Sequence, residues 1–111
     1  MEHYQLTNRD CSRTVSDRHL DEISLFLCCD WRGLRPYLGM KSVSVEDIGH
    51  GDEVEQRYAF FFTWKHLKGF RATYWKLLWA LFEVNSRVDA ERVCEMLQSS
   101  PRLLTDSDEV I

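Results

Sequence analysis

The residues that decide the fold are 53–84, EVEQRYAFFFTWKHLKGFRATYWKLLWALFEV. Apolar side chains recur in this stretch every three or four positions, which is the spacing that places them on one face of an α-helix. Gly69 follows a cationic turn and is typical of a helix end, and Thr73 can cap a new helix. We therefore predict two helices, over residues 53–67 and 74–84.

Capping residues and apolar spacing predict three shorter helices before this stretch. The expected ranges are residues 17–29, 31–38 and 45–48. The second of these contains Gly33 and Pro36, and a proline removes a backbone donor and clashes with the preceding turn. We therefore expect the second helix to be kinked or partly 3₁₀.

A last helix is predicted to open at Asp89, with Val93, Met96 and Leu97 as its apolar stripe. No segment alternates over a useful length with the two-residue period of a strand. The predicted fold class is therefore all-α, with six short helices and no sheet. The predicted boundaries are a flexible leader over residues 1–15, a helical domain over 16–99 and a frayed acidic tail over 100–111.

Length, charge and cysteine usage narrow the classes of function. With 111 residues the chain has room for one domain, and its formal net charge of −4 gives no general attraction to nucleic acid or to an anionic membrane. The longest strictly apolar run, residues 77–82, is far too short to span a bilayer. The cysteines show no CxxC spacing and the N-terminus has no apolar segment of the secretory kind. Free thiols and a cytoplasmic location are expected.

The sequence carries no pattern typical of catalysis or of metal binding. Its histidines are scattered and stand at no metal-ligand spacing from one another or from the cysteines. A glycine-rich phosphate loop is also missing. Cys28 and Cys29 close an apolar helix and are interpreted as buried packing thiols rather than nucleophiles. We predict no enzyme activity, no cofactor and no metal site.

A series of short motifs follows one order along the chain. The motifs are Asp30-Trp31-Arg32-x-Leu34, Tyr37-Leu38-Gly39, Val45-x-x-Ile48, Trp64-Lys65, Ala72-Thr73, Leu77-Leu78-x-Ala80-Leu81 and Asp89-Ala90-Glu91-x-Val93. In this order and spacing they resemble a death domain of the death-fold superfamily, over residues 20–97. The resemblance implies a six-helix antiparallel bundle of Greek-key topology. It also implies homotypic binding of other death domains, which builds signalling assemblies in apoptosis or innate immunity.

Three large aromatic residues depart from the family, whose helices usually carry polar residues at such positions. Phe62 is predicted to point outward once Phe61 and Trp64 face the core. Trp75 and Trp79 lie one turn apart, outside the inward stripe of their helix. The three rings either form an exposed interaction surface or lie half-buried over helix edges. Self-association through the helix that carries the two tryptophans is one expected consequence.

Charged side chains are unevenly distributed along the chain. The candidate acidic contacts are Glu46, Asp47, Asp52 and Glu53, and the candidate basic contacts are Arg32, Arg35, Lys68 and Arg71. Opposed patches on one small domain can dock head to tail and generate open helices or rings. The alternative interpretation is that these residues are simply solvated helix faces.

The same apolar spacing predicts which side chains form the core. They are Leu20, Ile23, Leu27, Trp31, Leu34, Leu38, Val45, Ile48, Tyr58, Phe61, Trp64, Leu77, Leu78, Leu81 and Val93.

Two hypotheses of function follow. The first is a non-catalytic adaptor module that binds other death-domain proteins, homotypically or heterotypically. The second is a passive packing domain of a larger cytosolic protein, whose exposed aromatics dock on a neighbouring domain. A helical nucleic-acid binder is a further alternative, against which the acidic balance argues.

Overall fold

Side-chain caps fix where four of the helices begin. The computed structural model describes residues 8–99, and the four helices are α2 (Asp17–Phe26), α3 (Val45–Ile48), α4 (Glu53–Lys68) and α5 (Tyr74–Glu83). Their capping residues, in the same order, are Ser16, Ser44, Asp52 and Thr73. Each cap accepts a hydrogen bond from a backbone N–H of the first turn, which would otherwise have no partner.

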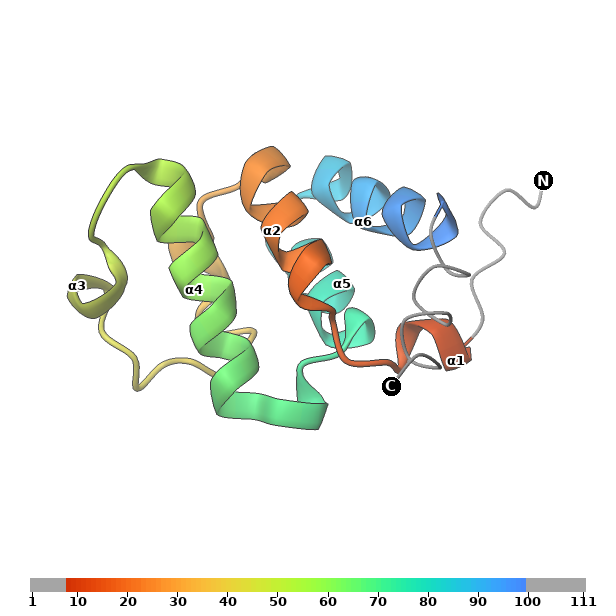
Figure 1. Ribbon diagram of the computed structural model, residues 1–111, viewed down its shortest axis with the longest axis horizontal. Helices are drawn as coiled ribbons and strands as arrows, with labels where there is room; N and C mark the ends of the chain where they lie inside the picture. Colours follow the sequence, from red (N-terminus) through yellow and green to blue (C-terminus); the bar gives the residue numbers. More distant parts are fainter. Residues whose placement is uncertain (1–7, 100–111) are drawn as a thin grey trace.

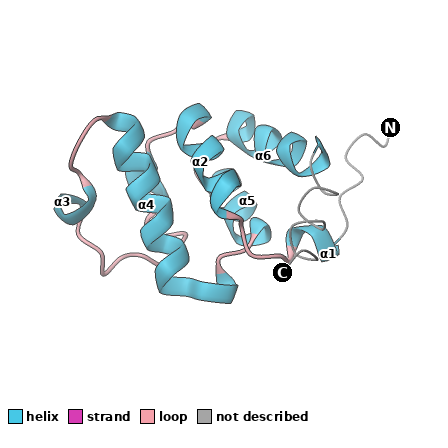
Figure 2. Cartoon of the chain, in the orientation of Figure 1, coloured by secondary structure: helices cyan, strands magenta, loops and turns pink. Residues whose placement is uncertain are grey.

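Shorter or uncapped segments complete the order of elements (Figures 1 and 2). They are α1 (Asn8–Cys11), the 3₁₀ turns η1 (Trp31–Leu34) and η2 (Gly69–Arg71), and α6 (Arg87–Ser99). Residues 8–99 contain no β-strand, so the all-α class is confirmed. The segment with Gly33 and Pro36 is a 3₁₀ turn followed by further turns, as these two residues predicted. None of the helices in the described residues combines the length and the apolarity needed to cross a bilayer.

Helix α2 lies between α4 and α6, and α5 packs on α6 (Figure 1). The core between them is centred on α4, where Phe60, Phe61 and Trp64 are all fully buried. The ring of Phe60 lies 5.1 Å from that of Trp31, which brings the irregular segment η1 against α4. Aromatic rings at this separation add to the stabilisation that burial itself provides.

The predicted core is confirmed at every position except two. Val45 is half-buried, and the side chain of Tyr58 is 36% exposed. The predicted burial of Tyr58 is wrong because this residue lies one turn from Phe62. Its ring stacks on the outward ring of Phe62, with 4.8 Å between the ring centres. The sequence did not predict the burial of Phe60 or of Met40.

The predicted loose leader is wrong for residues 8–15. Cys11 and Val15 are buried, and the Val15 N–H donates to the carbonyl oxygen of Ala72 at 2.8 Å. This pairing fixes the chain beside the start of α5, because the Tyr74 N–H likewise donates to the Arg13 carbonyl at 3.2 Å. Residues 1–7 and the predicted acidic tail, 100–111, lie outside the described residues.

A buried carboxylate, Asp89, joins the end of α2 to α6. It accepts hydrogen bonds from the backbone N–H groups of Cys28 and Cys29, at 2.9 and 3.0 Å, and from the Ser86 hydroxyl at 2.5 Å. These bonds explain why α2 ends at Phe26 and not at residue 29. The last helix begins before Asp89, at Arg87, so the predicted helix start is also wrong.

We expect Asp89→Asn to lower the free energy of unfolding by about 1–3 kcal/mol. The amide has one acceptor oxygen in place of two, so one backbone N–H at the end of α2 is left without its partner. Urea unfolding followed by circular dichroism measures the change. Glu91→Gln, an exposed position of the same helix, is the matched control, and equal losses in the two variants would contradict the role of Asp89.

His19 is buried and shares a hydrogen bond with the hydroxyl of Tyr74, 2.7 Å from its Nδ1. The phenol oxygen also accepts the Ser16 N–H at 3.2 Å, and its own proton can be donated to a neutral imidazole. Burial lowers the pKa of His19 below its ordinary value of 6.5, with Glu22 opposing and Arg18 adding to this shift. The folded domain therefore prefers the uncharged ring.

This preference predicts that acid destabilises the domain. The unfolded chain takes up a proton at His19 more readily than the folded chain does, so stability is full above pH 6.5 and falls as the pH drops toward the lowered pKa. Urea unfolding from pH 8 to pH 5 should show this loss, and His19→Gln should flatten it. An unchanged slope in the variant would show that other groups cause the acid sensitivity.

Candidate interaction surface

The predicted aromatic positions are exposed, but they do not form one patch. Trp75 and Trp79 on α5 are 48% and 44% exposed, and Phe62 on α4 is 39% exposed. Phe62 borders a different hollow, lined by Asp17, Lys65 and His66. There the Lys65 ammonium pairs with the Asp17 carboxylate at 2.7 Å. The two tryptophans therefore border one hollow of the surface, and Phe62 borders another.

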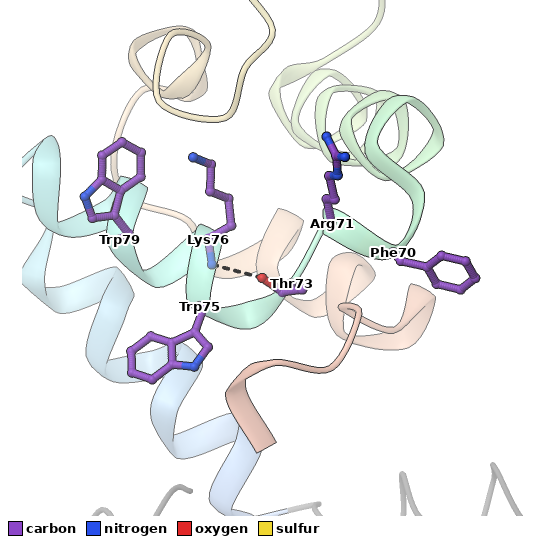
Figure 3. Close-up of a pocket in the computed structure, with 6 residues that line it drawn as sticks. All are labelled: Phe70, Arg71, Thr73, Trp75, Lys76 and Trp79. Carbon is purple, nitrogen blue, oxygen red and sulfur yellow. Dashed lines mark hydrogen bonds between the residues drawn. The ribbon is translucent and has the colours of Figure 1, made fainter. Parts of the chain in front are cut away.

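The two tryptophans line an open groove along α5 together with residues of η2 (Figure 3). The Nζ of Lys76 lies 4.3 Å from the centre of the Trp79 ring, a cation–π contact that holds this ring on one side. The ring of Tyr37 packs edge-on against it, with 5.7 Å between centres. Trp79 is thus partly packed, while Trp75 points to the other side of α5 (Figure 3).

Sequence reasoning missed Phe70, the most exposed large apolar side chain of the described residues at 91%. It lies in η2, between α4 and α5, and its ring points away from the tryptophans (Figure 3). Burying a whole phenylalanine side chain contributes about 2–3 kcal/mol, so full exposure forgoes a large stabilisation. The sequence contained a signal for this exposure. Only three residues separate Gly69 from the Thr73 cap, which leaves little chain to bring the ring of Phe70 inward.

The four predicted basic residues form two pairs that differ in their contacts. Arg32 bonds the Asp30 carboxylate at 2.8 Å and lies over the ring of Trp31. Arg35 donates to the backbone carbonyls of Val43 at 2.7 Å and of Lys41 at 3.2 Å, which clamps the turn. By contrast, Lys68 and Arg71 line one common pocket with Lys76. The second pair remains available for contacts, while the first pair is used within the fold.

The four predicted acidic residues are exposed and lie on α3 and at the start of α4. Two of them lie at helix N-termini: Asp52 caps α4 in a reciprocal capping box with Glu55, and the Glu46 carboxylate accepts a hydrogen bond from the Ser44 cap of α3. The Ser44 hydroxyl lowers the pKa of Glu46. Carboxylates at helix N-termini are stabilised by the helix dipole. Asp52 and Glu53 lie at the opposite end of α4 from Lys68, which the length of the helix places roughly 20 Å away.

Three of the four cysteines have a raised pKa, which disfavours the nucleophilic thiolate. Burial, followed by the nearby Asp89 carboxylate, raises the pKa of Cys29 to about 12. Burial also raises the pKa of Cys11 and of Cys94. Cys28 is exposed, so its predicted burial is wrong, since its backbone rather than its thiol faces Asp89. Within the described part of the chain, no three potential metal ligands converge.

These environments predict a strong selectivity toward alkylation. Because the thiolate is the reactive form, iodoacetamide at neutral pH should modify Cys28 first and Cys29 last. Peptide mass spectrometry of a time course measures the order, and the same reaction in urea should remove the difference. Equally fast modification of both neighbours in the folded protein would contradict the raised pKa of Cys29.

A scan against protein-family models, a search of curated proteins and a search of solved structures found no match to this chain.

Proposed function

We propose that this chain is a non-catalytic interaction module of the death-domain type, which self-associates and binds other death-domain proteins in cytoplasmic signalling assemblies of apoptosis or innate immunity. The observation that carries the proposal is the surface at the start of α5. Two half-exposed indoles line a groove there with Arg71 and Lys76, and Lys68 lies in the pocket that adjoins it. Aromatic and cationic side chains in combination are typical of protein interfaces.

The motif residues support the assignment because they have core positions. The side chains of Trp31, Leu34, Leu38, Ile48 and Trp64 are all buried. After α1 the chain runs through α2, η1, α3, α4, η2, α5 and α6. This order is compatible with the six segments that the resemblance implies when η2 is counted as the end of α4 and η1, with the turns after it, as the second segment. The death-fold topology itself is part of this proposal.

Charge supports a head-to-tail mode of self-association. The acidic end at α3 and the start of α4 is complementary to the basic end at Lys68 and Arg71, and both belong to the same small body. A contact between unlike patches leaves a free patch on each partner, so it propagates into rings or open filaments.

Light scattering behind a sizing column, over a range of concentration and salt, tests the proposal. We expect the mass to rise with concentration and to fall with added salt, because salt screens exposed charge pairs. Trp75→Glu with Trp79→Glu should remain monomeric while keeping its helicity by circular dichroism. A wild type that remains monomeric under all conditions would overturn self-association and favour the passive packing domain.

A charge-swap pair makes the test specific to the two ends. One variant carries Lys68→Glu and Arg71→Glu, and the other carries Glu46→Lys and Asp47→Lys. Each should be monomeric alone, because the reversal removes the charge complementarity between its two ends. An equal mixture should assemble again in strict alternation, and a mixture that stays monomeric would contradict the head-to-tail mode.

A further inference from the structure

A pocket of about 320 Å³ opens where the end of α4, the start of α5 and the turn before α3 meet. Its lining consists of Leu38, Gly39, Trp64, Lys68, Arg71 and Lys76. The pocket borders the tryptophan groove, with which it shares Arg71 and Lys76. Its volume lies in the range of small-ligand sites.

The charges of this pocket are all of one sign. Lys68, Arg71 and Lys76 contribute three cationic groups, and no carboxylate of the described residues lines the pocket. Within residues 8–99, none of these three side chains forms an ion pair. Figure 3 shows the side chains of Arg71 and Lys76 extending to the same side of the chain. Like charges held together without a counter-charge raise the local positive potential, and an anion would relieve their repulsion.

Gly39 brings the Lys68 amine close to the backbone. Gly39 has a φ of +72°, a backbone conformation that disfavours any residue with a side chain. A Cβ at this position would lie 2.9 Å from the Lys68 Nζ, so the absence of a side chain leaves room for the ammonium group. The turn thus holds one cation at the wall of the pocket.

The side chain of Trp64 lies in the wall of the pocket. It is fully buried, and its Nε1–H has no hydrogen-bond partner among the described residues. A buried indole N–H usually finds an acceptor, and an unpaired one costs about 1–3 kcal/mol. Trp64 lines the same pocket as the three cations, so the signal of its indole should report on a molecule bound there.

We propose that this pocket binds a phosphate monoester. A dianionic phosphate has enough charge and enough acceptor oxygens for a guanidinium and two ammonium groups together, which a single carboxylate lacks. The open groove beside the pocket leaves space for the organic part of the molecule. The site does not depend on the proposed self-association, and either can fail while the other holds.

Titration of the folded chain with phenyl phosphate, a simple phosphate monoester, at constant ionic strength tests the site. The readout is the ¹H–¹⁵N signal of the Trp64 indole, assigned with Trp64→Phe. We expect a saturable shift of that signal. Lys68→Gln with Arg71→Gln should weaken binding by about tenfold or more, because two charge-assisted hydrogen bonds are lost.

Lys41→Gln with Arg87→Gln is the matched control. It removes the same number of charges from exposed positions that do not line the pocket, and it should leave the affinity unchanged. The absence of a saturable shift would overturn the proposal. An equal loss of affinity in the two double variants would also overturn the proposal, because the affinity would then depend only on the total charge of the protein.

Two further measurements distinguish a soluble phosphate ester from a lipid headgroup. One uses inositol trisphosphate in solution, and the other uses phosphatidylcholine vesicles containing phosphatidylinositol bisphosphate. Binding in solution, with no preference for vesicles, supports the pocket with a soluble ligand. Stronger vesicle binding that Phe70→Ser weakens supports the pocket with a headgroup, because an exposed ring can insert at the bilayer surface. No binding in either measurement overturns the site.

Discussion

The constraint on which this structure depends is that α4 must bury two neighbouring faces. Phe60 and Phe61 are consecutive and both fully buried, although adjacent residues of a helix point about 100° apart. One neighbouring element therefore cannot cover both rings. Helix α2 packs on α4, and η1 brings the ring of Trp31 to Phe60. The irregular segment after α2 is thus required for the core, although it forms little regular helix.

Covering α4 in this way decides what remains on the surface. The segment that follows η1 brings Leu38 and Gly39 to the C-terminal end of α4, beside Lys68. The short turn at Gly69 then reverses the chain, so that Arg71 and Lys76 reach the same place from the other side. The cationic pocket is a consequence of how the core is closed, and it occurs where three separate segments meet.

The structure also separates charges that sequence composition treats alike. Arg32 and Arg35 are held by an acid and by backbone carbonyls, and Asp52 begins a helix. These groups stabilise local structure and have limited freedom to engage a partner. Lys68 and Arg71 lack such partners within the described residues. A binding role is therefore better assigned to charges by their contacts than by their density along the chain.

The sequence by itself determined the positions of the helices after residue 16 to within a few residues, most of the core and the outward direction of Phe62, Trp75 and Trp79. These properties depend on spacing and on caps within a few residues, which the sequence contains directly. Only the tertiary structure decided that residues 8–15 pack beside α5, that Asp89 is buried against the end of α2, and that Phe62 lies apart from the two tryptophans. Each of these depends on residues far apart in the chain that come together only when the core closes, and helical periodicity carries no information about such pairs.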